Sequence, residues 1–222
     1  MAESNPDTWA AVDRYLADTL VGHDPALEAT LAAQSRANLQ PIEVAPVAGK
    51  LLHLLVRIAC ARRVLEIGTL AGYSAIWMAR ALPEGGALVT IEAEPANAAV
   101  ARANLDAAGV GDAVDIRLGR AADVLPSLEG GEPFDLIFID ADKESNTVYL
   151  DWAARLGRRG SVVVVDNVGR SGEVANARSE DEQILGVRAG LEALRDDPRF
   201  DATALQTVGV KGWDGFALAV LV

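Results

Sequence analysis

Short apolar runs rich in β-branched residues alternate with helical segments through the middle of the chain. The runs cover residues 63–67, 87–91, 114–118, 134–139 and 161–165, and helices are expected near residues 73–82, 95–108, 121–128 and 146–156. Strands that are apolar along their whole length are buried on both faces, and strands joined through helices run parallel. The alternation therefore predicts an α/β fold with helices on both faces of a parallel sheet.

The first quarter of the chain shows a helical pattern instead. Apolar residues recur at helical spacing from Trp9 to Leu20, and Asp24-Pro25 is typical of a helix start with an N-cap aspartate and proline at the first helical position. A third helix is expected over about residues 47–61. Residues 1–61 are therefore predicted to form a helical N-terminal extension.

The last part of the chain departs from the alternation in another way. After a helix over about residues 181–195, two strands near residues 203–208 and 215–221 are separated by a segment too short for a crossover helix. Such a pair forms an antiparallel hairpin. We expect one domain over residues 1–222, in which a Rossmann-like core (62–222) holds a doubly wound, seven-stranded sheet that is mostly parallel and ends in the hairpin.

Charge and composition exclude several classes of protein. Lys+Arg 20 against Asp+Glu 32 gives a net charge of −12, which disfavours binding to a phosphate backbone. The sequence lacks both an apolar run of the ~18 residues that a membrane span needs and the features of a signal peptide. We expect a cytoplasmic protein with no nucleic-acid or membrane partner. Cys60 is the only cysteine and lies in an apolar run, so a buried thiol is expected.

Ligands of open parallel sheets bind at the carboxyl ends of the strands. The first strand leads into a glycine turn, from Gly68 to Gly72, that lets backbone N–H groups approach a ligand closely. Leu70 stands where the pyrophosphate fingerprint needs its second glycine, and Glu66 would repel a phosphate. A ligand with an amino group suits this turn better, although a plain strand-to-helix turn remains the alternative.

Glu92 ends the second strand. An acidic side chain at this position can accept hydrogen bonds from both hydroxyls of a ribose. Together with Glu66 and the glycine turn, it indicates a nucleoside ligand without a pyrophosphate. S-adenosylmethionine fits that description better than NAD.

Three oxygen-bearing residues follow two other strands, which we expect to be neighbours. Asp140 follows the fourth strand, and Asp166 and Asn167 end the fifth. Carboxylate and amide oxygens without cysteine or histidine suit Mg²⁺, Mn²⁺ or Ca²⁺ rather than Zn²⁺. Caps of loops are the alternative role of such residues.

Lys143 comes three residues after Asp140. Near a divalent cation its ammonium form would be disfavoured, so the side chain could act as a general base. A salt bridge to Asp142 or Glu144 is an equally good interpretation.

These motifs resemble those of a known family. The segments Val64-Leu65-Glu66-Ile67-Gly68 to Gly72-Tyr73-Ser74, Asp140-Ala141-Asp142-Lys143 and Val165-Asp166-Asn167 are similar to the cation-dependent O-methyltransferases, a group that includes caffeoyl-CoA and catechol O-methyltransferase-like enzymes. The resemblance covers about residues 41–222 and is greatest to the bacterial branch. It implies cofactor contacts from Val44, Glu66, Gly68, Thr69, Ser74, Glu92, Ala121 and Asp140, metal ligation by Asp140, Asp166 and Asn167, and a catalytic Lys143.

The resemblance also implies an activity. The expected reaction is transfer of a methyl group from S-adenosylmethionine to a hydroxyl of a catechol-type or other vicinally oxygenated phenol, with a divalent cation, Mg²⁺ before Mn²⁺ or Ca²⁺. It further implies a homodimer. Two alternatives from the residues stay open: an NAD(P)-dependent oxidoreductase of similar fold, and a non-catalytic cofactor-binding protein. The N-terminal helices and the loop over residues 169–179 are expected to select the substrate.

Overall fold

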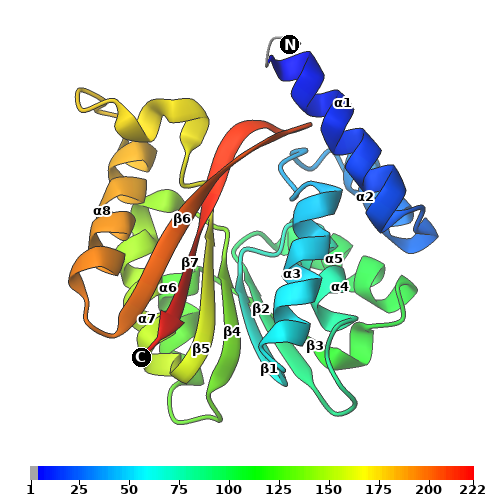
Figure 1. Cartoon of the computed structure of the whole chain (residues 1–222). Helices are drawn as coiled ribbons and strands as arrows, with labels where there is room; N and C mark the ends of the chain where they lie inside the picture. The colour runs from blue at the N-terminus through cyan, green and yellow to red at the C-terminus, as the bar shows by residue number, and fades with distance from the viewer. Residues whose placement is uncertain (1–4) are drawn as a thin grey trace.

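A computed structural model describes residues 5–222, which form one seven-stranded sheet flanked by helices (Figure 1). The strands are β1 (Arg63–Ile67), β2 (Ala87–Glu92), β3 (Val114–Leu118), β4 (Phe134–Ile139), β5 (Gly157–Asp166), β6 (Phe200–Gly209) and β7 (Gly212–Leu221). Their order is β3-β2-β1-β4-β5-β7-β6, with β1 to β5 parallel and β7 antiparallel to both of its neighbours. The predicted mixed sheet with its C-terminal hairpin is confirmed.

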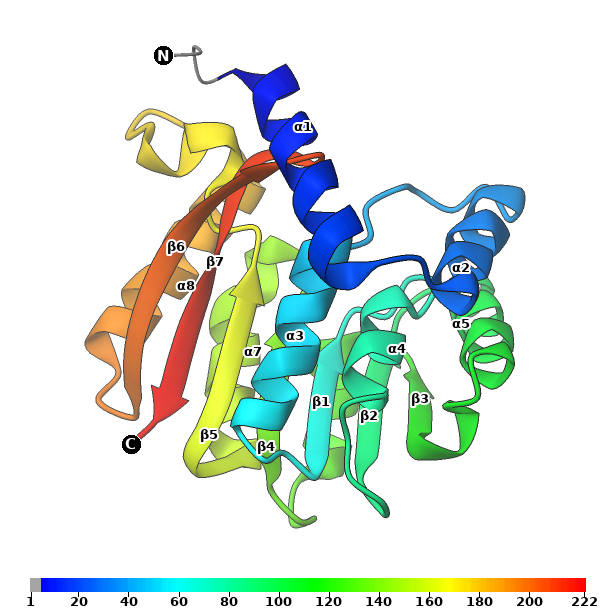
Figure 2. The ribbon, with the colours of Figure 1, turned by 45° about the vertical axis from the view of Figure 1, so that its right-hand side comes forward.

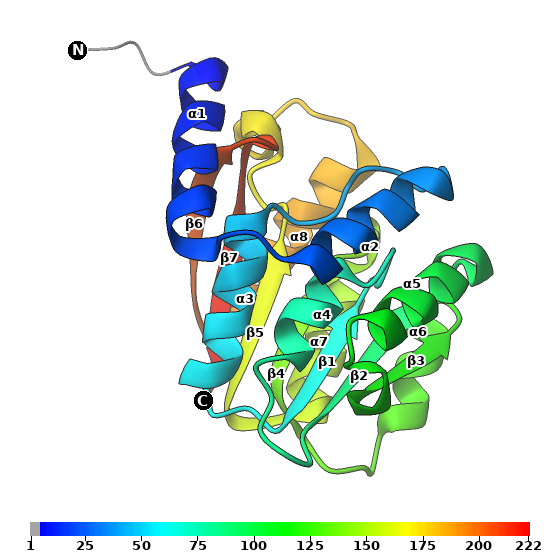
Figure 3. The same ribbon diagram turned by 90° about the vertical axis from the view of Figure 1, so that its right-hand side faces the viewer.

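Helices cover both faces of the sheet (Figures 1 and 3). One layer is α3 (Pro46–Ile58), α4 (Tyr73–Ala79) and α5 (Pro95–Ala107); the other is α6 (Ala121–Val124), α7 (Asn146–Leu156) and α8 (Glu182–Asp196). Successive residues of a strand point to opposite faces, so Val64 packs with the α3–α5 core while Leu65 and Ile67 pack with the α6–α8 core. Both faces of the parallel strands are therefore buried, as their apolar runs predict.

Single turns join these elements. A π-helical turn spans Ala17–Val21, and 3₁₀ turns span Gly111–Ala113, Leu125–Leu128, Lys143–Ser145 and Arg170–Ala175.

The N-terminal helices lie at the end of the sheet where the parallel strands finish (Figure 2). These are α1 (Pro6–Leu16) and α2 (Pro25–Arg36), the latter capped by the Asp24 carboxylate as predicted. The Asp13 carboxylate accepts the backbone N–H of Val210 at 2.9 Å, and Nζ of Lys211 lies 2.6 Å from Oε1 of Glu43. The tip of the β6–β7 hairpin thus ties the N-terminal segment down over the carboxyl end of the sheet.

The prediction of a buried thiol at Cys60 is wrong, because this side chain is exposed. Helix α3 ends at Ile58, and Cys60 adopts a left-handed backbone conformation (φ 49°) just beyond it, where the apolar face of the helix no longer continues. Within residues 5–222, no helix combines the length and the apolar character that crossing a membrane requires.

Candidate active site

Asp140 and Asp166 lie side by side at the carboxyl ends of β4 and β5. Ile139 pairs with Val165, so the residues that follow each of them emerge from neighbouring strands, which are about 4.8 Å apart in a sheet. Nζ of Lys143 donates to Oδ1 of Asp140 at 2.9 Å, and this lysine is only 5% exposed. Lys143 thus pairs with Asp140 at the edge of the sheet where Asp166 also emerges. Ligation of one cation by Asp140, Asp166 and Asn167 stays a prediction.

The electrostatics of the pair favour a bound cation. Burial, and then the neighbouring Asp140 carboxylate, raise the pKa of Asp166 to about 7, while the ammonium of Lys143 opposes this shift. A nearby positive charge stabilises the charged form of a carboxylate such as Asp166. The ammonium of Lys143 supplies such a charge and forms its ion pair with Asp140.

The donor set at this edge consists of oxygen atoms. Asn167 follows Asp166 directly, in a left-handed conformation (φ 60°), and its backbone N–H donates to Oδ1 of Asp166 at 2.8 Å. No group of three or more histidine, cysteine, aspartate and glutamate side chains that could hold a metal occurs within the described part of the chain. A cation site here would have two carboxylates and would need the amide of Asn167 as a further ligand. That set fits a hard cation.

The surroundings of Lys143 show which carboxylate it pairs with. Asp142 accepts a 2.5 Å hydrogen bond from the Tyr149 hydroxyl, whose pKa is raised by burial and by this bond. The lysine pairs with Asp140 instead of Asp142 or Glu144. It therefore lies beside Asp140, and its role as a general base stays a prediction.

Glu66 lies beneath the glycine turn with none of its surface exposed. Its Oε1 accepts from Oγ of Ser74 at 2.5 Å and its Oε2 from Oγ1 of Thr90 at 2.6 Å, while Oγ1 of Thr69 is 2.5 Å from Oγ1 of Thr90. Burial raises the pKa of Glu66 to about 8, although the two hydroxyl donors oppose that shift. This chain of polar contacts fixes the start of α4 against β1 and β2.

Glu92 organises the glycine turn from the end of β2. Its Oε2 accepts the backbone N–H of Thr69 at 3.2 Å and of Leu70 at 2.7 Å, and its Oε1 accepts the N–H of Glu94 at 2.9 Å. The first bonds stabilise Leu70 in a left-handed conformation (φ 51°), which is unfavourable for a leucine. Ribose binding by Glu92 stays a prediction.

Gly68 joins the glycine turn to the carboxylate cluster. A Cβ at this position would lie 2.1 Å from the carbonyl oxygen of Asp140, and the residue has φ 99°. The ends of β1 and β4 therefore approach more closely than any other residue type would allow. A ligand in the turn lies beside Asp140.

Val44 and Ala121 are both buried, in the segment before α3 and at the start of α6. Their contacts with a cofactor stay predictions.

The sequence alone did not identify two residues of this region, Thr90 and Asp214. Thr90 is a polar residue in an apolar strand, and that contrast is a usable signal for a buried contact. Asp214 accepts backbone N–H groups of the loop after Asn167, and nothing in its local sequence indicates this contact.

The fold and the strand-end residues define a Rossmann-like α/β protein with a ligand site at the carboxyl end of its sheet. Residues 19–220 match the O-methyltransferase family, and the chain belongs to this family.

Individual relatives agree with this assignment. A catechol O-methyltransferase of Mycobacterium tuberculosis is 55% identical over 210 residues, which are 95% of this chain and 94% of that protein. The crystal structure of a Bacillus cereus O-methyltransferase in complex with SAH superposes with a TM-score of 0.96 at 49% identity, covering 98% of this chain and 100% of the other. The Streptomyces achromogenes O-methyltransferase TomG, involved in tomaymycin synthesis and solved with SAM, gives a TM-score of 0.95 at 45% identity over 99% and 100% of the chains. The chain is thus a SAM-dependent O-methyltransferase.

Proposed function

We propose that this O-methyltransferase acts on catechol-type phenols with vicinal oxygens and requires a divalent cation, Mg²⁺ in preference to Mn²⁺ or Ca²⁺. The observation that carries the proposal is the placement of Lys143 beside Asp140 and Asp166 at adjoining strand ends. The Mycobacterium tuberculosis relative, named a catechol O-methyltransferase, supports the substrate class.

Asp140, Asp166 and Asn167 would hold the cation. A divalent cation supplies Lewis acidity, which favours ionisation of a phenol held next to it. Two vicinal oxygens suit such a site because oxygen-preferring cations take six or more ligands, and the chain offers three at this point. The remaining positions are therefore open to substrate and water.

Lys143 would take the proton of the hydroxyl that becomes methylated. With a cation held by Asp140, the ammonium of Lys143 would lose its partner and be repelled, which would favour the neutral amine. The proton would pass to Nζ of Lys143, and the phenolic oxygen would bond to the methyl carbon while the carbon–sulfur bond of S-adenosylmethionine breaks to give SAH. The chain contributes chiefly by holding both partners in line, an effect that can supply roughly 7–11 kcal/mol.

The glycine turn would hold S-adenosylmethionine, with Gly68, Thr69 and Ser74 near its methionine part and Glu92 at its ribose. Val44 and Ala121 would give apolar contacts. The hydroxyls of Ser74 and Thr90 already donate to the two carboxyl oxygens of Glu66. We therefore propose that Glu66 supports the glycine turn that holds the cofactor.

Membership of the O-methyltransferase family favours methyl transfer over both alternatives. An NAD(P)-dependent oxidoreductase would need a glycine where Leu70 stands. The grouping of Asp140, Lys143 and Asp166 at one edge of the sheet argues against a non-catalytic cofactor-binding protein. The homodimer implied by the resemblance is also a proposal, which light scattering can check.

The proposed function predicts that turnover of catechol, followed by mass spectrometry of the methyl ether, falls at least 100-fold in EDTA and returns with Mg²⁺. Resorcinol, which has the same hydroxyls in non-vicinal positions, is the matched control substrate and is expected to react at least 100-fold more slowly. If EDTA does not lower turnover, the need for a divalent cation is contradicted. If catechol and resorcinol react at equal rates, the need for vicinal hydroxyls is contradicted.

A further inference from the structure

The backbone that follows Asn167 is held by the β6–β7 hairpin. The N–H of Val168 donates to the carbonyl of Gly215 at 3.0 Å. The N–H groups of Gly169 and Arg170 both donate to Oδ1 of Asp214, each at 2.9 Å. Two consecutive hairpin residues therefore fix three consecutive amides directly after the proposed cation ligand.

This loop needs an outside restraint because of its conformation. Asn167, Arg170 and Ser171 have φ values of 60°, 49° and 53°. The left-handed region is unfavourable for residues with a side chain, so each costs free energy that contacts elsewhere must offset. One carboxylate oxygen of Asp214 accepts hydrogen bonds from two backbone N–H groups of this loop, those of Gly169 and Arg170. These bonds help to offset the cost of the loop conformation.

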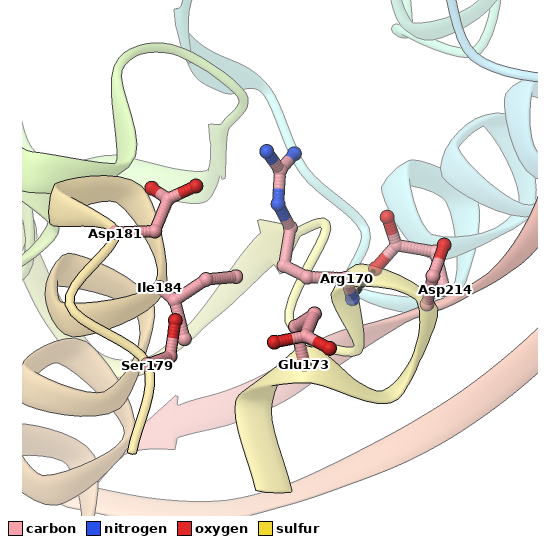
Figure 4. A pocket seen from close by; sticks show the side chains of 7 residues that line it. Arg170, Glu173, Ser179, Asp181, Ile184 and Asp214 are labelled. Carbon is pink, nitrogen blue, oxygen red and sulfur yellow. Dashed lines mark hydrogen bonds between the residues drawn. The ribbon is translucent and has the colours of Figure 1, made fainter. Parts of the chain in front are cut away.

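The loop and the hairpin also fit closely. A Cβ on Gly169 would lie 2.6 Å from the carbonyl atoms of Asp214, and a Cβ on Gly172 would lie 2.9 Å from the Trp213 ring. Figure 4 shows Asp214 beside the start of the loop, at one side of a cavity of about 430 Å³ that Arg170 also lines. The carboxylate thus lies between the loop backbone and this cavity.

We propose that Asp214 is a positioning residue. By accepting hydrogen bonds from the backbone N–H groups of Gly169 and Arg170, it holds the side-chain amide of Asn167 in place for cation binding. The inference rests on the proposed cation site.

The test compares Asp214→Ala, Asp214→Asn and the control Asp201→Ala, which removes an exposed carboxylate from β6. Binding of Mn²⁺ is measured by calorimetry, SAH binding is measured in EDTA, and hydrogen exchange is followed over residues 167–172. The asparagine variant keeps an oxygen that can accept both bonds, whereas alanine removes it.

We expect Asp214→Ala to weaken Mn²⁺ binding at least tenfold, to keep SAH affinity within twofold and to speed exchange of the three amides. Asp214→Asn is expected to stay within threefold of the wild type, as is the control. If the alanine variant does not fold, Asp214→Ser, whose hydroxyl is too short to reach the loop, has to show the same selective loss.

Three results would overturn the inference: unchanged Mn²⁺ affinity in Asp214→Ala, equal losses in the alanine and asparagine variants, or unchanged exchange. Normal Mn²⁺ binding by wild type and Asp214→Ala alike would overturn this inference alone. A wild-type protein that binds no Mn²⁺ would overturn the proposed cation site as well.

Discussion

Glu66 is a carboxylic acid without exposed surface, between two hydroxyl donors and beneath the proposed cofactor site. Burial raises its pKa from 4.5 to about 8. The folded protein therefore keeps this proton up to about pH 8, whereas the unfolded chain releases it near pH 4.5. Between these values the folded state binds more protons, so the free energy of unfolding falls as the pH rises.

Glu66→Gln is expected to remove part of this slope in the metal-free protein. Relative to the wild type, the variant should gain stability between pH 5 and pH 8 by on the order of a few kcal/mol, measured by urea unfolding at each pH. Glu132→Gln, at an exposed position, is the matched control. Asp166, with a pKa raised to about 7, adds a slope of the same sign in all variants. If the free energy of unfolding depends on pH in the same way in Glu66→Gln and in the wild type, the raised pKa of Glu66 is contradicted.

At the scale of elements, α8 determines where Lys143 lies. A Cβ on Gly186 would lie 2.3 Å from the carbonyl oxygen of Lys143 and 2.6 Å from Cα of Glu144, whereas a Cβ on Gly190 would meet only the Asn146 side chain, at 3.0 Å. Backbone atoms cannot rotate out of the way as a side chain can. The first glycine therefore allows the turn that carries Lys143 to lie against the helix.

Gly186→Ala should consequently shift that turn and lower kcat for catechol about 10- to 100-fold, since displacement of a reacting group by about 1 Å has an effect of that size. Overpacking should also cost about 1–3 kcal/mol of stability, partly offset by the higher helix propensity of alanine. Gly190→Ala is the graded comparison, with a smaller loss of kcat. Activity and stability are measured together, and wild-type kcat in Gly186→Ala would refute the packing argument.

Element types follow from the sequence better than element ends do. Apolar runs predict β1 to β4 within a residue at each end, because the local pattern and burial agree there. β5 begins at Gly157 rather than at residue 161, across Arg158 and Arg159, since pairing with β4 extends the strand into polar sequence. β6 begins at Phe200, and most of its residues are exposed. Its bounds therefore follow from its pairing with β7 and not from an apolar pattern of its own.

At the scale of the molecule, the sheet order brings together residues that are far apart in the chain. Strand-end reasoning predicts Asp140, Lys143 and Asp166 as one cluster, because parallel neighbours end at the same edge. The contacts of Asp214 with the loop after Asn167, and of Gly186 with the turn that carries Lys143, depend on how the hairpin and α8 pack, which no local pattern encodes. The sequence therefore predicts the reacting groups, and the structure adds the residues that support them.

Anomalous diffraction from crystals of the SAH complex soaked in Mn²⁺ tests the cation site most directly. We predict one strong peak about 2.1 Å from carboxylate oxygens of Asp140 and Asp166 and from the amide oxygen of Asn167, a distance typical of small oxygen-ligated dications. A peak elsewhere, or none at full Mn²⁺ loading, would contradict it.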